Sequence, residues 1–232
     1  SALYTHHARP RTLSATGFHL ASLAALGWPV PATPPAPRLA LAPTAVEEAR
    51  AALRAAGVAE DATLGGFHPG ARWPTRRWPP ASFAALAARL LAARPDAVAL
   101  ITAGPGEEAL AREVAAALPA ARTQVVAGWP LPRFVALQSR CAAFVCGDTG
   151  PLHTAVAAGT PTLGLLGRNR PAAFFPYPEA GGHRAYTARV ECSPCDRDEC
   201  ADLRCLARLT VDGAWARLEA MLAGARSARA LC

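Results

Sequence analysis

Residues 142–153 read Ala-Ala-Phe-Val-Cys-Gly-Asp-Thr-Gly-Pro-Leu-His, and this stretch decides the fold. The apolar run from Ala142 to Cys146 predicts a buried strand, and Pro151 stands where the first turn of a helix tolerates a missing N–H. Such a helix start presents free N–H groups and the positive end of the helix dipole, which favour phosphate. An ordinary capped helix start that binds no ligand explains the same residues equally well.

Strands and helices alternate along most of the chain. The expected strands are 62–67, 97–103, 123–126, 142–146, 162–166 and 184–190, and the expected helices are 14–26, 44–56, 81–93, 107–118, 131–140 and 152–158. This alternation predicts an α/β fold with a doubly wound parallel sheet. Ligands of such sheets bind beyond the carboxyl ends of the strands, so the loops that follow the strands should carry the chemistry.

The composition excludes several classes of protein. Hydrophobic residues make up 52% of the chain, but no apolar run reaches the roughly 18 residues that would cross a bilayer. The net charge is +7, yet the 24 basic residues, all Arg, are interspersed with 17 acidic ones, which argues against nucleic-acid binding. No secretory leader is expected, so the seven cysteines favour a reducing compartment. The motifs of P-loop nucleotidases, serine hydrolases and zinc proteases are absent.

A cationic segment follows the strand that ends at Phe67. It contains Arg76 and Arg77, with Trp73 and Trp78 interleaved. The guanidinium groups could clamp a diphosphate and stabilise charge on a leaving nucleotide. The alternative is solvated arginine stacked on tryptophan, which is common on surfaces.

Glu107 opens the helix that follows Gly104-Pro105-Gly106. Its carboxylate could accept hydrogen bonds from both hydroxyls of a ribose. It could equally be an acidic residue in the first turn, which the helix dipole favours.

Four cysteines cluster in one loop of mixed charge, at positions Cys192, Cys195, Cys200 and Cys205. Four thiolates at such spacing could hold Zn or Fe tetrahedrally. The alternatives are reduced free thiols and reversible disulfides.

Three groups of residues together resemble glycosyltransferase family 9, the lipopolysaccharide heptosyltransferases. They are 67–71 with 76–79, 104–107, and 148–153. The resemblance implies a two-domain GT-B fold whose Rossmann-like C-terminal half holds the donor. Residues 1–43 would then be a remnant of the N-terminal acceptor domain with the interdomain linker, so the N-terminal portion would be truncated. Residues 44–212 would be the nucleotide-sugar-binding domain, including the Cys-rich loop 192–205, and 213–232 would be a C-terminal helix.

The resemblance also implies roles for single residues. Asp148 would contact the sugar hydroxyls, Glu107 the ribose, and the backbone near Trp129 the base. The family usually has Lys where Arg76 stands, which changes the geometry of the cation. The acidic catalytic base of the family has no counterpart in this chain. The other implied roles are diphosphate binding by the backbone of Gly70, Ala71, Thr149 and Gly150, leaving-group stabilisation by Arg76 and Arg77, and orientation of Asp148 or a phosphate by His153.

The activity that the resemblance implies is a metal-independent, inverting transfer of heptose or a related sugar from a donor such as ADP-heptose. The acceptor would be a lipopolysaccharide core or a protein, and no cofactor would be required for the chemistry. The enzyme would be cytoplasmic, with peripheral contact at the inner face of the inner membrane. The Cys cluster is similar to one in protein heptosyltransferases that bind iron. The alternatives are a nucleotide-sugar-binding module without turnover and an interaction protein organised by a metal.

Overall fold

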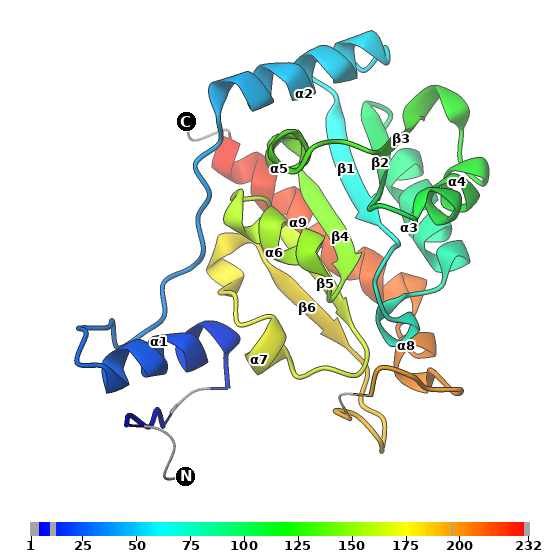
Figure 1. Cartoon of the computed structure of the whole chain (residues 1–232). Helices are drawn as coiled ribbons and strands as arrows, with labels where there is room; N and C mark the ends of the chain where they lie inside the picture. Colours follow the sequence, from blue (N-terminus) through cyan, green and yellow to red (C-terminus); the bar gives the residue numbers. More distant parts are fainter. Residues whose placement is uncertain (1–4, 10–12, 196, 230–232) are drawn as a thin grey trace.

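The computed structural model describes residues 5–9, 13–195 and 197–229 (Figure 1). Parts of three expected segments therefore lie outside the described residues. They are 1–4 and 10–12 of the segment 1–43, 196 of the Cys-rich loop 192–205, and 230–232 of the C-terminal helix.

The described chain forms a six-stranded parallel sheet in the order β3-β2-β1-β4-β5-β6. The strands are β1 (Thr63–His68), β2 (Ala97–Ala103), β3 (Thr123–Ala127), β4 (Ala143–Gly147), β5 (Thr162–Leu166) and β6 (Arg184–Thr187). The expected doubly wound α/β sheet is confirmed. The order reverses between β1 and β4, and this reversal leaves a crevice at the carboxyl ends of the two strands.

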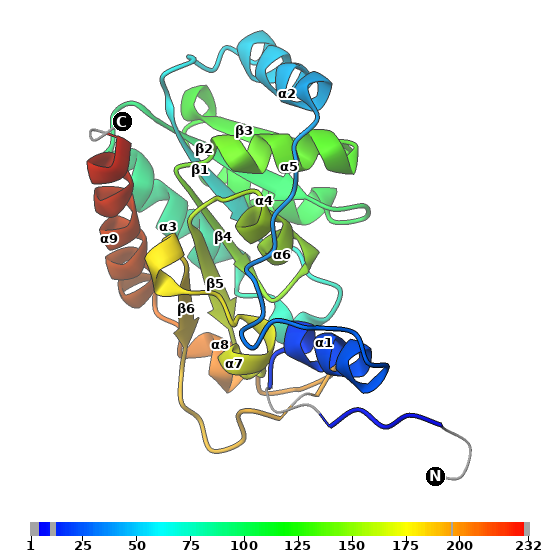
Figure 2. The ribbon, with the colours of Figure 1, turned by 90° about the vertical axis from the view of Figure 1, so that its left-hand side faces the viewer.

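Helices cover both faces of the sheet (Figure 2). One face carries α3 (Pro80–Ala93), α4 (Glu108–Ala116) and α9 (Val211–Arg229). The other face carries α2 (Pro43–Ala55), α5 (Leu131–Arg140) and α6 (Gly150–Ala157). Both faces of every central strand are therefore buried, which explains why the strands read as nearly continuous apolar runs.

Trp78 belongs to the core and not to the cationic segment at the surface. Its side chain is fully buried against Phe83 of α3, and its Nε1 donates a hydrogen bond to the carbonyl of Leu209 at 2.8 Å. This bond ties the segment before α3 to the turn before α9. The pattern of arginine and tryptophan around residue 76 thus combines one core residue with surface residues.

The structure adds short elements that periodicity does not predict. They are η1 (Pro74–Arg76), η2 (Ala120–Arg122), α7 (Pro171–Phe174), η3 (Glu179–Gly181) and α8 (Arg204–Ala207). Each is a single turn, which is too short to show an apolar periodicity in the sequence. The edge strand β6 is also shorter than expected, since the pairing with β5 ends at Thr187.

Helix α1 (Ala15–Ala25) lies apart from the sheet, at the end of a long connection (Figure 1). The Ser14 side chain caps its first turn by accepting a hydrogen bond from Gly17 N at 3.1 Å. Gly27 adopts φ +83° directly after the helix, a conformation that favours glycine. The helix and its flanks leave Phe18 53% and Trp28 67% exposed.

Candidate functional site

The candidate site lies at the carboxyl edge of the sheet, where the strand order reverses. His68 ends β1 and Asp148 follows β4, so both flank the crevice. The loops after β2, β3 and β5 open at the same edge because all six strands are parallel. The loops expected to carry chemistry therefore meet in one place.

Asp148 is a buried carboxylate, with only 4% of the residue exposed. Its Oδ2 lies 3.1 Å from Nη1 of Arg76 and accepts a hydrogen bond from Asn169. Its Oδ1 lies 3.8 Å from Nε2 of His153. Burial raises the pKa of Asp148, and the charge of Arg76 offsets part of that effect. Oδ1 is the less engaged oxygen and is suited to accept a hydroxyl of a ligand.

His153, on α6, connects Asp148 to Tyr177. The Nδ1 atom of His153 lies 2.6 Å from the Tyr177 hydroxyl, and the two rings meet edge to face. Burial lowers the pKa of His153, so the ring is neutral at pH 7. His153 is thus within reach of Asp148, as the predicted orienting role requires.

The first turn of α6 faces open space. Thr149 is the N-cap residue, but its side chain makes no capping hydrogen bond to the helix. A Cβ added to Gly150 would meet no atom within 4 Å. Gln138 donates to the carbonyl of Pro151 at 2.8 Å and so supports this turn. An anion at this helix start would meet N–H groups that no side chain caps, at the positive end of the dipole.

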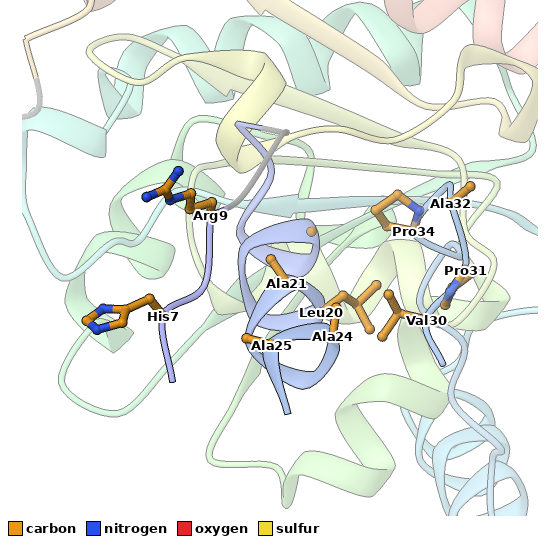
Figure 3. Close-up of a pocket in the computed structure, with 11 residues that line it drawn as sticks. His7, Arg9, Leu20, Ala21, Ala24, Ala25, Val30, Pro31, Ala32 and Pro34 are labelled. Atoms are coloured by element: carbon orange, nitrogen blue, oxygen red, sulfur yellow. The ribbon is translucent and has the colours of Figure 1, made fainter. Parts of the chain in front are cut away.

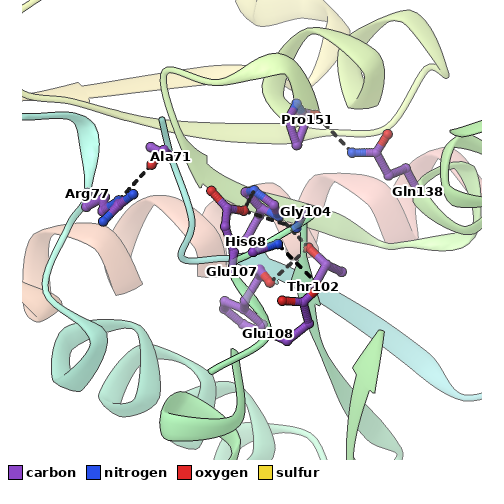
Figure 4. A network of polar contacts seen from close by, with 11 residues as sticks. His68, Ala71, Arg77, Thr102, Gly104, Glu107, Glu108, Gln138 and Pro151 are labelled. Carbon is purple, nitrogen blue, oxygen red and sulfur yellow. Dashed lines mark hydrogen bonds and ion pairs between the residues drawn. The ribbon is translucent and has the colours of Figure 1, made fainter. Parts of the chain in front are cut away.

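Arg76 and Arg77, expected to act together, have different partners. Nη1 of Arg76 reaches both the carboxylate of Asp148 and, at 3.3 Å, its carbonyl. Nε of Arg77 donates instead to the carbonyl of Ala71 at 2.7 Å (Figure 4). Arg76 is therefore placed beside the expected sugar contact, and Arg77 supports the backbone of the expected diphosphate loop.

Glu107 is already engaged within the protein (Figure 4). Its Oε2 accepts a hydrogen bond from Gly104 N at 3.0 Å and lies 3.3 Å from Nε2 of His68. The hydrogen bond from His68 is the main reason that the pKa of Glu107 is lowered. The Glu107 carboxylate also packs on Gly70, where a Cβ would collide with it. Only glycine at position 70 fits this arrangement.

A cavity of about 510 Å³ opens beside His68 and Gly104, the two residues whose nitrogens face Oε2 of Glu107. Arg133 lies over the Trp129 ring, with its guanidinium carbon 3.9 Å from the ring centroid. A concave, mostly apolar site with a few polar groups at one end suits a planar base and its ribose. Its walls include His68, Gly104, Trp129, Leu131, Phe134 and Pro151.

The structure adds three residues that the sequence did not single out. Asn169 and Arg168 belong to the loop after β5, which was expected to carry chemistry, and both are 4% exposed. Arg168 pairs with Asp198 of the Cys-rich loop at 2.8 Å. Tyr177 reaches the site from a segment with no strand or motif signal, so nothing in the sequence could have identified it.

The expected metal cluster does not fit the structure. Cys192 and Cys200 are exposed, Cys195 is partly buried and Cys205 is buried, all as free thiols. Among the described residues, which leave out Asp196 of this loop, no group of three His, Cys, Asp or Glu residues could hold a metal ion. The loop instead contacts the site through its backbone, because Cys195 N donates to the carbonyl of Arg168 at 3.1 Å.

A second cavity, of about 620 Å³, lies between α1 and the segment that follows it (Figure 3). Leu20 and Ala24 of α1 face Val30 and Pro34, while His7 and Arg9 lie on the other side of the helix. None of the expected site residues lines this cavity.

Helices long and apolar enough to cross a membrane are absent from the described part of the chain. A search of curated proteins found no match.

Solved structures share the fold. A family 9 glycosyl transferase from Veillonella parvula DSM 2008 matches with a TM-score of 0.79 and 19% identity, over 94% of this chain and 62% of that one. The E. coli ADP-heptose lipopolysaccharide heptosyltransferase II matches with a TM-score of 0.69 and 23% identity, over 86% and 57%. The E. coli heptosyltransferase WaaC with ADP-2-deoxy-2-fluoro heptose matches with a TM-score of 0.61 and 18% identity, over 94% of this chain and 58% of that one.

The chain thus spans about 57–62% of the length of these structures. The model of one family, described as glycosyltransferase family 9 (heptosyltransferase), matches residues 10–205. A match over most of the chain establishes the family, and the chain therefore belongs to glycosyltransferase family 9.

Proposed function

We propose that this chain binds a nucleotide-diphospho-sugar such as ADP-heptose and serves as the donor half of a glycosyltransferase. The sugar, a heptose or a related one, would pass to a lipopolysaccharide core or a protein acceptor. One observation carries the proposal: the buried carboxylate of Asp148 and the uncapped start of α6 lie at the reversal of strand order, where Pro151 also lines the apolar cavity. Such an edge offers separate places for base, diphosphate and sugar.

The comparisons support the donor class. WaaC of E. coli has been solved with ADP and with ADP-2-deoxy-2-fluoro heptose, and a dodecameric iron-containing heptosyltransferase, TibC, with ADP-D-beta-D-heptose. Those ligands belong to those proteins. They come to this chain as a proposal because the family and the fold are shared.

In the proposed complex the base fills the cavity beside Trp129 and the ribose lies against Glu107. The diphosphate binds the backbone N–H groups of the loop at Gly70 and Ala71 and of the turn at Thr149 and Gly150. Asp148 accepts the sugar hydroxyls through Oδ1.

Arg76 lies beside Asp148 and stabilises the charge that grows on the departing diphosphate. The proposed displacement is inverting and passes through no metal, since it needs only an acceptor hydroxyl, a base and a stabilised leaving group. The base is unassigned. No step is routed through the four cysteines, because their arrangement does not fit a metal.

Calorimetric titration with ADP and with ADP-heptose tests the donor site. Heat of binding that saturates with both nucleotides is expected. Absence of binding of either one at millimolar concentration would contradict the proposal.

The second candidate is a donor-binding module without turnover of its own. Its supporting observation is that the chain spans 57–62% of the length of the structures it resembles. Transfer from ADP-heptose to a lipopolysaccharide acceptor, followed by mass spectrometry, separates the two. Product formed by this chain alone would exclude the module, and binding without product would favour it.

The metal and membrane predictions are separate from this chemistry. Elemental analysis of protein purified without chelators tests the first: far less than one Zn or Fe per chain is expected, because the described thiols form no group that could hold a metal, and about one per chain would contradict this expectation. Peripheral membrane contact at the cytoplasmic face is decided by co-sedimentation with anionic vesicles.

A further inference from the structure

His68 is a buried polar residue of the site to which neither the motif nor the proposed donor contacts give a role. It ends β1, its side chain is 4% exposed, and it lines the 510 Å³ cavity. One ring nitrogen faces Thr102 and the other faces Glu107 (Figure 4). A buried histidine held at both nitrogens has a fixed ring orientation.

Thr102 can satisfy His68 in either protonation state. Its Oγ1 lies 2.9 Å from Nδ1 of His68 and 3.3 Å from the carbonyl of Phe67. When the ring is neutral, the hydroxyl donates to Nδ1, and the proton of the ring sits on Nε2. When the ring is charged, Nδ1–H donates to the hydroxyl, which donates in turn to the Phe67 carbonyl. In both states Nε2 carries a hydrogen directed at Glu107.

The carboxylate of Glu107 receives this hydrogen on one oxygen only. Oε2 lies 3.3 Å from Nε2 of His68 and also accepts from Gly104 N at 3.0 Å. Oε1 accepts no hydrogen bond from the part of the chain that the structure describes. Two donors on Oε2 therefore fix the carboxylate next to His68 and Gly104, which line the cavity, and Oε1 keeps its capacity to accept a hydrogen bond from a ligand.

The other ionisable groups near His68 favour the ionised carboxylate of Glu107 and add no further negative charge. Arg77 acts on Glu107 as a positive charge and helps to keep it ionised. Cys146 stands opposite His68 in the register of β1 and β4, and burial raises its pKa well above the usual value, so the thiol is neutral. Within the described part of the chain, Glu107 is the carboxylate with which His68 forms an ion pair.

We propose that His68 is a positioning residue for ribose recognition, which holds the Glu107 carboxylate so that Oε1 accepts a ribose hydroxyl of the bound nucleotide. The inference rests on the proposed donor site. It adds that recognition of the ribose depends on three residues in contact, in which Thr102 holds His68 and His68 holds Glu107.

The test compares ADP with 2′,3′-dideoxy-ADP by calorimetry. In the unaltered chain, loss of both hydroxyls is expected to weaken binding by about 10- to 100-fold, the usual size for hydrogen bonds to a charged group.

Substitution of His68 separates positioning from structure. His68→Leu is expected to lower the selectivity to about threefold or less by weakening ADP alone, whereas His68→Gln, whose amide can still donate, should recover part of it. His19→Gln, at an exposed histidine on α1, is the matched control and should leave it unchanged. Thr102→Val removes the hydroxyl that contacts His68 and keeps the branched side chain, so it should lower selectivity about threefold and provides the test if His68→Leu does not fold.

The outcomes distinguish this inference from the proposed function. If the unaltered chain binds neither nucleotide, the donor site itself is wrong and the inference falls with it. If it binds both, and selectivity is unchanged in His68→Leu, or in Thr102→Val where His68→Leu does not fold, the donor site stands and the role of His68 is overturned.

Discussion

Asp148→Asn removes a buried charge from the site and keeps the shape of the side chain. Asp148 is 4% exposed, and burial raises its pKa although Arg76 lies 3.1 Å away. A raised pKa means that folding disfavours the ionised form, so a neutral isostere relieves a cost. The variant is expected to match the unaltered chain in stability or to exceed it by up to about 1 kcal/mol at pH 7.

The size of this stability difference depends on pH. Above the raised pKa of Asp148 the carboxylate is ionised, and the full cost of burying it is present in the unaltered chain. The cost falls as the pH decreases through the raised pKa, and it vanishes below the ordinary value of 3.8, where the carboxyl is protonated in the folded and unfolded states alike. The two chains should therefore converge in stability on acidification. Urea unfolding at pH 7 and at pH 4 measures the convergence.

Asp148→Asn should weaken binding of the donor, although it leaves stability unchanged or slightly higher. Because Asp148 is proposed to contact the sugar and not the nucleotide, ADP-heptose should bind about 10- to 100-fold more weakly to the variant, with ADP affected about twofold or less. A loss of stability of about 3 kcal/mol or more would show that Asp148 is a structural ion-pair partner. Equal weakening of ADP and ADP-heptose would refute the sugar contact.

Two glycines at the site give contrasting predictions. Gly70→Ala pushes a methyl group against the carboxylate of Glu107, which must give up its positions at Gly104 and His68 to make room, so ADP should bind about 10-fold more weakly in calorimetry while the fold stays intact. Gly147→Ala drives a methyl group into the backbone carbonyl of Arg76, so urea unfolding should show a loss of about 1–3 kcal/mol. Gly224→Ala, on the exposed side of α9 with no atom within 4 Å, is the control for both and should be neutral or slightly stabilising. Equal stability of Gly147→Ala and this control would contradict the packing argument.

The sequence predicts the helices and strands of this fold because its apolar residues recur at regular helical or strand spacing. Ala97–Ala103 and Thr162–Leu166 were expected at the bounds that β2 and β5 have, and Leu131–Arg140 at those of α5. Each is a short apolar run or a one-faced repeat bounded by Gly, Pro or Arg. The order of the strands in the sheet depends on tertiary packing. The alternation of strands and helices in the sequence restricts this order but does not determine it.

The site was predictable only where one loop carries both the motif and the function. Asp148 and its turn are contiguous, so their shared place at a helix start could be read directly. The contact between His68 and Glu107 joins two loops that come together only after β1 and β2 pair. Tyr177 reaches His153 from an irregular segment, and neither an apolar periodicity nor a motif in the sequence predicts this contact.

The central claim is that the nucleotide occupies the crevice between β1 and β4, beside the cavity that Trp129 lines. The most direct test is an NMR titration of ¹⁵N-labelled protein with ADP that follows the indole signals of its five tryptophans, with Trp129→Phe identifying one of them. The claim predicts a saturable shift of the Trp129 indole and none for Trp28, which is 67% exposed just after α1. A shift of Trp28 with an unmoved Trp129, or no shift at all, would contradict it.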